Sequence, residues 1–117
     1  MDRSDLASRK CTPCQGDEPP LKGEALNELS DRLGNDWEVV DEDHIEKEYE
    51  LKDFQSALDF TNSVGAIAEE QGHHPDIELG WGRVQLNIKT HKIDGLSEND
   101  FILAAKADEA FEERGSD

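Results

Sequence analysis

Apolar side chains recur at two different spacings along this chain, and each spacing predicts a different kind of element. In three stretches they return every three or four residues, which is the period of an amphipathic helix. These stretches are residues 21–33, 54–71 and 98–111.

Residues typical of helix ends flank these stretches. Gly34 and Gly72 follow the first two stretches as left-handed helix stops. Asp53 precedes the second as an N-cap, and Ser97 opens a capping box with Asp100 before the third. The pattern predicts three helices.

Elsewhere apolar and polar residues alternate one by one, which is the period of a half-buried strand. In residues 44–51, for example, Ile45 and Tyr49 share one face while three glutamates share the other. Four short strands are predicted in this way, at residues 37–40, 44–51, 76–81 and 84–89. The acidic turn after the first of them makes the first two a hairpin.

The predicted order is helix, two strands, helix, two strands, helix. An antiparallel sheet with helices on one face is the natural way to bury these apolar stripes. We therefore expect an α+β fold in which a four-stranded antiparallel sheet carries three helices on one face.

The length of 117 residues fits one domain, which we place at residues 21–113. Residues 1–20 are polar and end in a Gly- and Pro-containing stretch, so we expect a flexible N-terminal arm that adds little to the core. Residues 114–117 are expected to form a polar tail.

Acidic residues dominate the composition. The chain has 29 Asp and Glu against 12 Lys and Arg, a formal net charge of -17 at pH 7. Such a charge repels nucleic-acid phosphate, so the chain is not expected to bind nucleic acid. Molar salt shortens the Debye length to about 3 Å and screens the self-repulsion, so the composition favours a salt-loving source. There is no run of about 18 apolar residues and no signal-peptide pattern, so we expect a cytoplasmic protein with no membrane association.

Both cysteines lie in the predicted arm, in the sequence Cys11-Thr12-Pro13-Cys14. Such a pair can be half a zinc site, a redox pair or a leader without a role. No predicted strand precedes it, as a thioredoxin-like pair would require, and a four-ligand zinc site lacks obvious partners. The role of Cys11 and Cys14 therefore stays open.

Three of the four histidines fall within residues 73–91, where they stand among acidic and aromatic residues at fixed spacing. The free histidine side chain has a pKa of about 6.5, so a cluster of histidines indicates acid–base chemistry near neutral pH. The full pattern is Glu69, His73, His74, Pro75, Trp81, His91 and Asp100.

This pattern resembles the signature of the pterin-4a-carbinolamine dehydratase family, and the Cys-x-Pro-Cys leader is similar to that of microbial members. The resemblance covers residues 21–112 and implies an α+β fold of four antiparallel strands and three helices. It implies a hydro-lyase that removes water from a 4a-hydroxytetrahydropterin to give a quinonoid dihydropterin, with no metal or organic cofactor. It also implies a homodimer or homotetramer, and a link to an aromatic amino-acid hydroxylase in tetrahydrobiopterin recycling.

The resemblance assigns His73 and His91 to proton transfer at the 4a-hydroxyl, and His74 to binding the pterin and assisting. Glu69 lies four residues before His73, one helical turn away, and is expected to orient its ring. Asp100 either orients His91 or serves only as a capping residue. Continuing the alternation of the last strand, His91 is expected to face away from the core.

Two tryptophans and the remaining histidine have weaker roles. Trp37 and Trp81 can offer flat surfaces to a pterin, although an aromatic residue at the end of a strand is more often part of the core. His44 lies outside the pattern, at the edge of an acidic strand, and is expected to be solvated.

Two alternatives remain open at this point. The histidines and a carboxylate can form a zinc site, although adjacent residues such as His73 and His74 point apart on an extended chain and do not easily share one ion. A non-catalytic dimerisation or binding module is the second alternative, since an unpaired strand edge invites association. The glutamate-rich strand at residues 44–51 is expected to repel a copy of itself at low salt.

Overall fold

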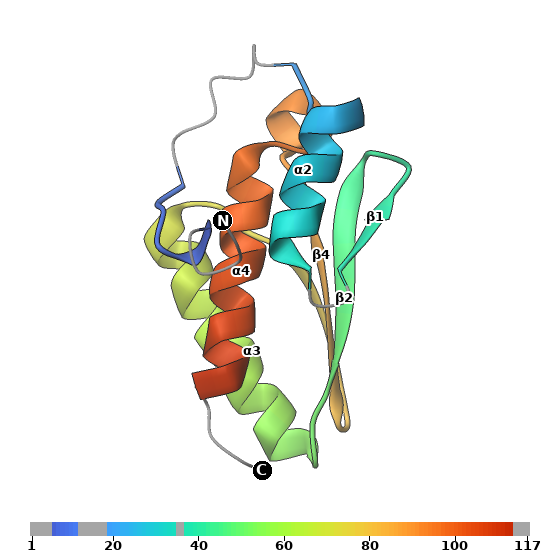
Figure 1. The fold of residues 1–117 in the computed structure, drawn as a ribbon. Coiled ribbons are helices and arrows are strands. Elements are labelled where there is room, and N and C mark those ends of the chain that lie inside the picture. Colours follow the sequence, from blue (N-terminus) through green and yellow to red (C-terminus); the bar gives the residue numbers. More distant parts are fainter. Residues whose placement is uncertain (1–5, 12–18, 35–36, 114–117) are drawn as a thin grey trace.

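The structure is a computed structural model that describes residues 6–11, 19–34 and 37–113. Its elements, labelled as in Figure 1, are α2 (Gly23–Leu33), β1 (Glu38–Val40), β2 (His44–Glu50), α3 (Phe54–Gln71), β3 (Asp76–Gly80), β4 (Arg83–Ile88), the 3₁₀ helix η1 (His91–Ile93) and α4 (Glu98–Glu113). Apart from η1, this is the predicted order of three helices and four strands. The α+β fold is confirmed.

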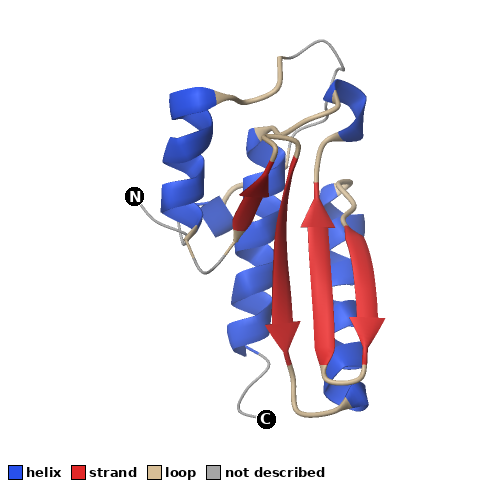
Figure 2. Cartoon of the chain, turned by 90° about the vertical axis from the view of Figure 1, so that its right-hand side faces the viewer, coloured by secondary structure: helices blue, strands red, loops and turns tan. Residues whose placement is uncertain are grey.

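The four strands form one antiparallel sheet in the order β1-β2-β4-β3. Figures 1 and 2 show that the helices cover one face of this sheet and leave the other face open. In the register, Tyr49 of β2 lies opposite Val84 of β4, and Leu86 of β4 lies opposite Ile77 of β3. Val84, Leu86 and Ile88 are fully buried, so the alternation in β4 was assigned to the correct face.

The sheet order places the glutamate-rich strand away from the sheet edge. β2 is an interior strand between β1 and β4, and the edge strands are β1 and β3. However, β1 pairs only with residues 44–46 of β2. Within the described residues, the remainder of β2 therefore has no strand on that side, as Figure 2 shows.

The two ends of α3 follow the predicted signals. The Asp53 side chain accepts a hydrogen bond from the Ser56 backbone N–H at 2.8 Å at the start of α3. Gly72 ends this helix in the left-handed conformation, with φ of 65°, which glycine adopts at little cost. The chain therefore leaves α3 sharply just before the paired histidines. Among the described residues, no helix combines the length and the apolar character needed to cross a membrane.

A buried carboxylate joins α4 to the sheet. Asp108 accepts hydrogen bonds from Trp37 Nε1 at 2.9 Å, Lys47 Nζ at 3.0 Å and Tyr49 Oη at 2.6 Å. Its side chain is 1% exposed. Trp37 lies just before β1 instead of within a strand, and it is 9% exposed. It is therefore a core residue with a satisfied indole N–H.

The first described segment differs from the expectation that residues 1–20 add little to the core. Leu6 is fully buried and Ala7 is 8% exposed, and both belong to the hydrophobic core. Two apolar residues were too short a pattern to reveal this, because their partners come from distant parts of the chain. The expectations about Cys14 and about the tail at 114–117 fall outside the described residues.

Candidate active site

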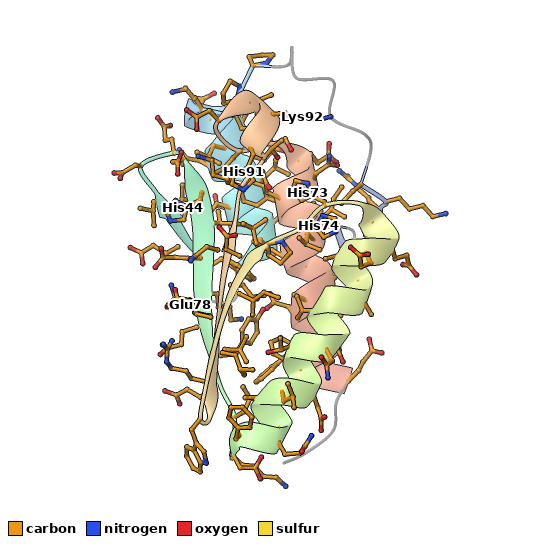
Figure 3. All side chains as sticks on the ribbon, turned by 180° about the vertical axis from the view of Figure 1, so that it is seen from behind. His44, His73, His74, Glu78, His91 and Lys92 are labelled. Carbon is orange, nitrogen blue, oxygen red and sulfur yellow. The ribbon has the colours of Figure 1, made fainter. Side chains whose placement is uncertain are left out.

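Three chain segments meet at one end of the sheet: the end of α3, the turn after β4 and the start of α4. They enclose a cavity of about 390 Å³, within the range of roughly 300–1,000 Å³ that is usual for small-molecule sites. His73, His74 and His91 all line it. Figure 3 shows these three side chains together at one end of the molecule. The structure therefore brings the predicted histidines to one site, between the end of α3 and the end of β4.

His73 is held by a buried carboxylate. Its Nε2 lies 2.6 Å from Asp100 Oδ1, and the two side chains are 12% and 0% exposed. Because a carboxylate accepts, Nε2 carries the proton and donates a hydrogen bond to Asp100. Nδ1 of His73 is then the nitrogen left to exchange a proton with a substrate, and the bond to Asp100 fixes the orientation of the ring.

Asp100 does more than hold His73. Its Oδ2 also accepts from the Ser97 backbone N–H at 2.8 Å and from Thr90 Oγ1 at 2.8 Å. The bond to the Ser97 N–H is one half of the capping box predicted from the sequence, while the Ser97 hydroxyl lies 2.8 Å from Thr90 Oγ1 instead of capping the Asp100 N–H. The capping role and the orienting role, treated as alternatives at first, coexist. The histidine that Asp100 orients is His73 instead of His91.

His74 is paired with the other predicted carboxylate. His74 Nε2 lies 2.5 Å from Glu69 Oε2, and the side chains are 59% and 78% exposed. Glu69 was expected to orient His73. That expectation assumed continued helical geometry, but the left-handed turn at Gly72 rotates His73 away from the axis of α3 and leaves His74 near Glu69.

His91 is the first residue of η1 and is exposed, as expected for a residue facing away from the core. The turn that carries it is closed by the Thr90–Gly95 bridge and by a bond from the Asp94 backbone N–H to the His91 carbonyl at 3.1 Å. Lys89 Nζ ties this turn to the β1–β2 turn by bonds of 2.8 Å to Asp94 and to Asp43. These two carboxylates raise the pKa of Lys89.

The structure does not bring the tryptophans to the cavity. Trp81 lies in the β3–β4 turn, at the opposite end of β4 from His91, and is 72% exposed. Trp37 is in the core beside Asp108. Neither residue lines the cavity in the described part of the chain.

His44 is less solvated than expected. Its ring nitrogens bond to Asp43 at 3.0 Å and Glu46 at 3.1 Å, and its side chain is 25% exposed. Partial burial lowers the pKa of His44, but the hydrogen bonds to the two carboxylates outweigh this effect and leave the pKa raised.

Sequence reasoning missed several residues of the cavity wall. Gln71, Asn99, Lys92 and Cys11 all line it. Gln71 lies two residues before His73 and Asn99 lies next to Asp100, so their nearness to predicted site residues was a usable signal. Cys11 is far away in sequence and gave no such signal. Burial raises the pKa of the Cys11 thiol to about 11, so it is protonated at neutral pH.

A metal centre finds no support in this geometry. Within residues 6–11, 19–34 and 37–113, no group of three or more His, Cys, Asp or Glu side chains is placed to hold an ion. His73 and His74 each face a different carboxylate, which separates the adjacent pair.

The fold and the cavity define a small α+β protein with a histidine-lined site for a small molecule. The family described as pterin 4 alpha carbinolamine dehydratase matches residues 19–110. A relative from Rubrobacter xylanophilus, named for the same dehydratases, is 55% identical over 105 residues, covering 90% of this chain and 97% of its own. A relative from Alkaliphilus metalliredigens with the same name is 46% identical, covering 90% of this chain and 95% of its own.

Solved structures agree. The crystal structure of a transcriptional coactivator/pterin dehydratase from Brucella melitensis is similar, with a TM-score of 0.72 and 30% identity, covering 77% of this chain and 96% of its own. A pterin dehydratase-like RuBisCO assembly factor of the alpha-carboxysome shares the fold alone, with a TM-score of 0.57 and 20% identity, covering 67% of this chain and 92% of its own. The chain belongs to the pterin-4-alpha-carbinolamine dehydratase family. It is a hydro-lyase that acts on a pterin carbinolamine.

Proposed function

We propose that the protein dehydrates a 4a-hydroxytetrahydropterin to the quinonoid dihydropterin by histidine acid–base catalysis. The observation that carries the proposal is the bond between His73 and the buried Asp100 at one wall of a cavity that His74 and His91 also line. A fixed imidazole in a cavity of substrate size is the arrangement that proton transfer requires.

The reaction needs one proton donor and one proton acceptor. The C4a–O bond breaks as the hydroxyl takes up a proton and leaves as water, while the neighbouring ring nitrogen loses its proton and its electron pair forms the new double bond. One proton is taken up and one is released, and because the only species lost is water, no oxidant or reductant is consumed. Two positioned side chains typically contribute about 10²- to 10⁴-fold each to such transfers.

In the proposed assignment, His73 and His91 exchange protons at the 4a-hydroxyl. They come from two different segments that line the cavity, the one that follows α3 and the turn after β4. Asp100 fixes the ring of His73. His74, held by Glu69 at the exposed rim, binds the pterin and assists.

The proposed setting is tetrahydrobiopterin recycling in the cytoplasm of a salt-loving source, downstream of an aromatic amino-acid hydroxylase that makes the carbinolamine. No metal or organic cofactor takes part in the proposed reaction.

The proposal also includes a homodimer or homotetramer. The part of β2 beyond residue 46 offers backbone groups to a second copy, because β1 does not reach it. Glu48 and Glu50 lie on this part of the strand, so we expect association to strengthen with salt. Light scattering at low and at molar salt measures the oligomer directly.

The test of the activity is a stopped-flow assay in high salt. Purified protein is expected to accelerate the loss of absorbance of freshly generated 4a-hydroxytetrahydropterin. A rate equal to that in buffer would rule out the proposed reaction and leave the binding-module alternative.

A further inference from the structure

The described part of the N-terminal arm, residues 6–11, is attached to the domain at several points. Leu6 is fully buried in the core. The Ala7 carbonyl accepts from Lys106 Nζ at 2.8 Å, and Arg9 forms an ion pair with Glu98 at the start of α4. The family match begins at residue 19, so this segment lies outside the part of the chain that defines the family.

The segment reaches the cavity at Cys11. The Cys11 backbone N–H donates to Gln71 Oε1 at 2.9 Å, and the Cys11 thiol donates to the Asn99 carbonyl at 3.6 Å. Both partners line the cavity that holds the three histidines, and Cys11 lines it too. Cys11 therefore bridges the last residue of α3 and the first turn of α4, close to where His73 follows α3 and where Asp100 lies in that first turn.

We propose that Cys11, which the attached segment 6–11 holds in place, forms part of the wall of the histidine-lined cavity, contacts the pterin bound there and limits the width of this pterin cleft. The inference rests on the proposed function, because it takes the histidine-lined cavity to be the pterin site. It assigns a role to one of the two cysteines that the sequence left without one.

The character of Cys11 indicates a contact and not a reactive group. A thiol is the nucleophile only as a thiolate, and this thiol stays protonated because burial raises its pKa to about 11. A protonated cysteine behaves as a small apolar side chain with a weak donor. Its size is then what matters: a larger side chain at position 11 would project into the space that the pterin needs.

The first experiment is protection of Cys11 from alkylation. Replacing Cys14→Ser leaves Cys11 as the single thiol of the chain. Iodoacetamide labelling is followed at about pH 9, where a thiol with so high a pKa still reacts measurably. We expect 7,8-dihydrobiopterin at ten times its dissociation constant to slow labelling by about tenfold.

A matched control places the single thiol one residue away. Lys10 is exposed and does not line the cavity. In the variant Lys10→Cys with Cys11→Ser and Cys14→Ser, the same pterin is expected to leave the labelling rate unchanged. Equal labelling of Cys11 with and without the pterin, in protein shown by calorimetry to bind it, would overturn the inference.

The second experiment separates binding from chemistry. Cys11→Trp is expected to raise KM by about tenfold or more, because the larger side chain overfills the cleft, and to change kcat by less than about twofold. Lys10→Trp, the same substitution at the neighbouring exposed position, is expected to leave both constants unchanged. An unchanged KM in a folded Cys11→Trp variant would overturn the inference, and the labelling experiment decides the question if that variant does not fold.

Failure of the inference and failure of the proposed function give different results. An active enzyme whose Cys11 labelling ignores the pterin disproves the wall and leaves the dehydratase reaction in place. An inactive protein that does bind 7,8-dihydrobiopterin and protects Cys11 supports the wall and disproves the reaction.

Discussion

His73 Nε2 lies 2.6 Å from Asp100 Oδ1, although the two residues are 27 positions apart in the sequence. Asp100 is fully buried and also caps α4 through the Ser97 backbone N–H. The carboxylate that starts the last helix therefore holds the first histidine of the site. The stability of α4 and the orientation of His73 depend on the same side chain.

Replacing Asp100→Asn is expected to lower kcat by about 10- to 100-fold, because a hydrogen bond to a charged group contributes about 1.5–3 kcal/mol and an amide of similar size replaces the carboxylate. The pH profile of kcat should also shift, which a loss of folded protein alone would not produce. Glu113→Gln, an exposed position at the end of the same helix, is the control and should keep both the rate and the profile. Wild-type kcat in Asp100→Asn would contradict the orienting role.

Removing the proposed proton-transfer groups is expected to have the largest effect on the rate. His73→Ala and His91→Ala should each lower kcat/KM by about 10²- to 10⁴-fold, since positioned acid–base groups contribute this much. His44→Ala should leave the rate within about twofold, because His44 bonds to Asp43 and Glu46 and does not line the histidine cavity. A small effect at both His73 and His91 would contradict the assignment. Steady-state kinetics on folded variants provide the measurement.

Asp108→Ala is expected to reduce the free energy of unfolding by about 3–5 kcal/mol, because it leaves the buried Trp37 and Tyr49 donors and the Lys47 ammonium without their shared acceptor. Urea unfolding followed by tryptophan fluorescence measures the change. Glu113→Ala, an exposed acidic residue on the same helix, should change stability by less than about 0.5 kcal/mol. Similar urea midpoints for the two variants would show that the network adds little.

His44 gives the stability of the fold a pH dependence. Its pKa is raised in the folded state, so its contribution is complete below the pKa of the unfolded chain, about 6.5, and is lost as pH rises through the folded value. The melting temperature of wild type should therefore exceed that of His44→Gln at about pH 5.5, and the difference should shrink by about pH 9. A difference that grows with pH would contradict this assignment.

The net charge of -17 predicts a response to salt. On the open face of the sheet, Gln85 lies between Glu48 of β2 and Glu78 of β3 in the register, so like charges face one another across one strand. We expect the melting temperature to rise as KCl is increased from about 0.05 M to 2 M, because screening weakens this repulsion. Calorimetry in KCl and in an equal osmolarity of sucrose separates screening from general exclusion effects. A melting temperature that falls in KCl would contradict a salt-adapted chain.

The elements were predictable because their signals are local. Asp53 and Gly72 mark the two ends of α3, and the alternation from Val84 to Ile88 identifies the buried face of β4. The pairing of the site was less predictable. Helical spacing predicted that Glu69 contacts His73, but the left-handed conformation of Gly72 turns the chain so that Glu69 bonds to His74 instead. Trp37 was treated as a possible pterin contact until its indole N–H was found on Asp108.

The sequence by itself determined the order of elements, the cap that Asp100 provides to Ser97 and the three histidines, because period, caps and motif spacing are properties of neighbouring residues. Only the tertiary structure decided which carboxylate holds which histidine, that β2 is an interior strand, that Leu6 is buried in the core and that Cys11 contacts the start of α4. These depend on contacts between residues far apart in the chain, whose partners are chosen by packing of the whole domain and leave no periodic trace in the sequence.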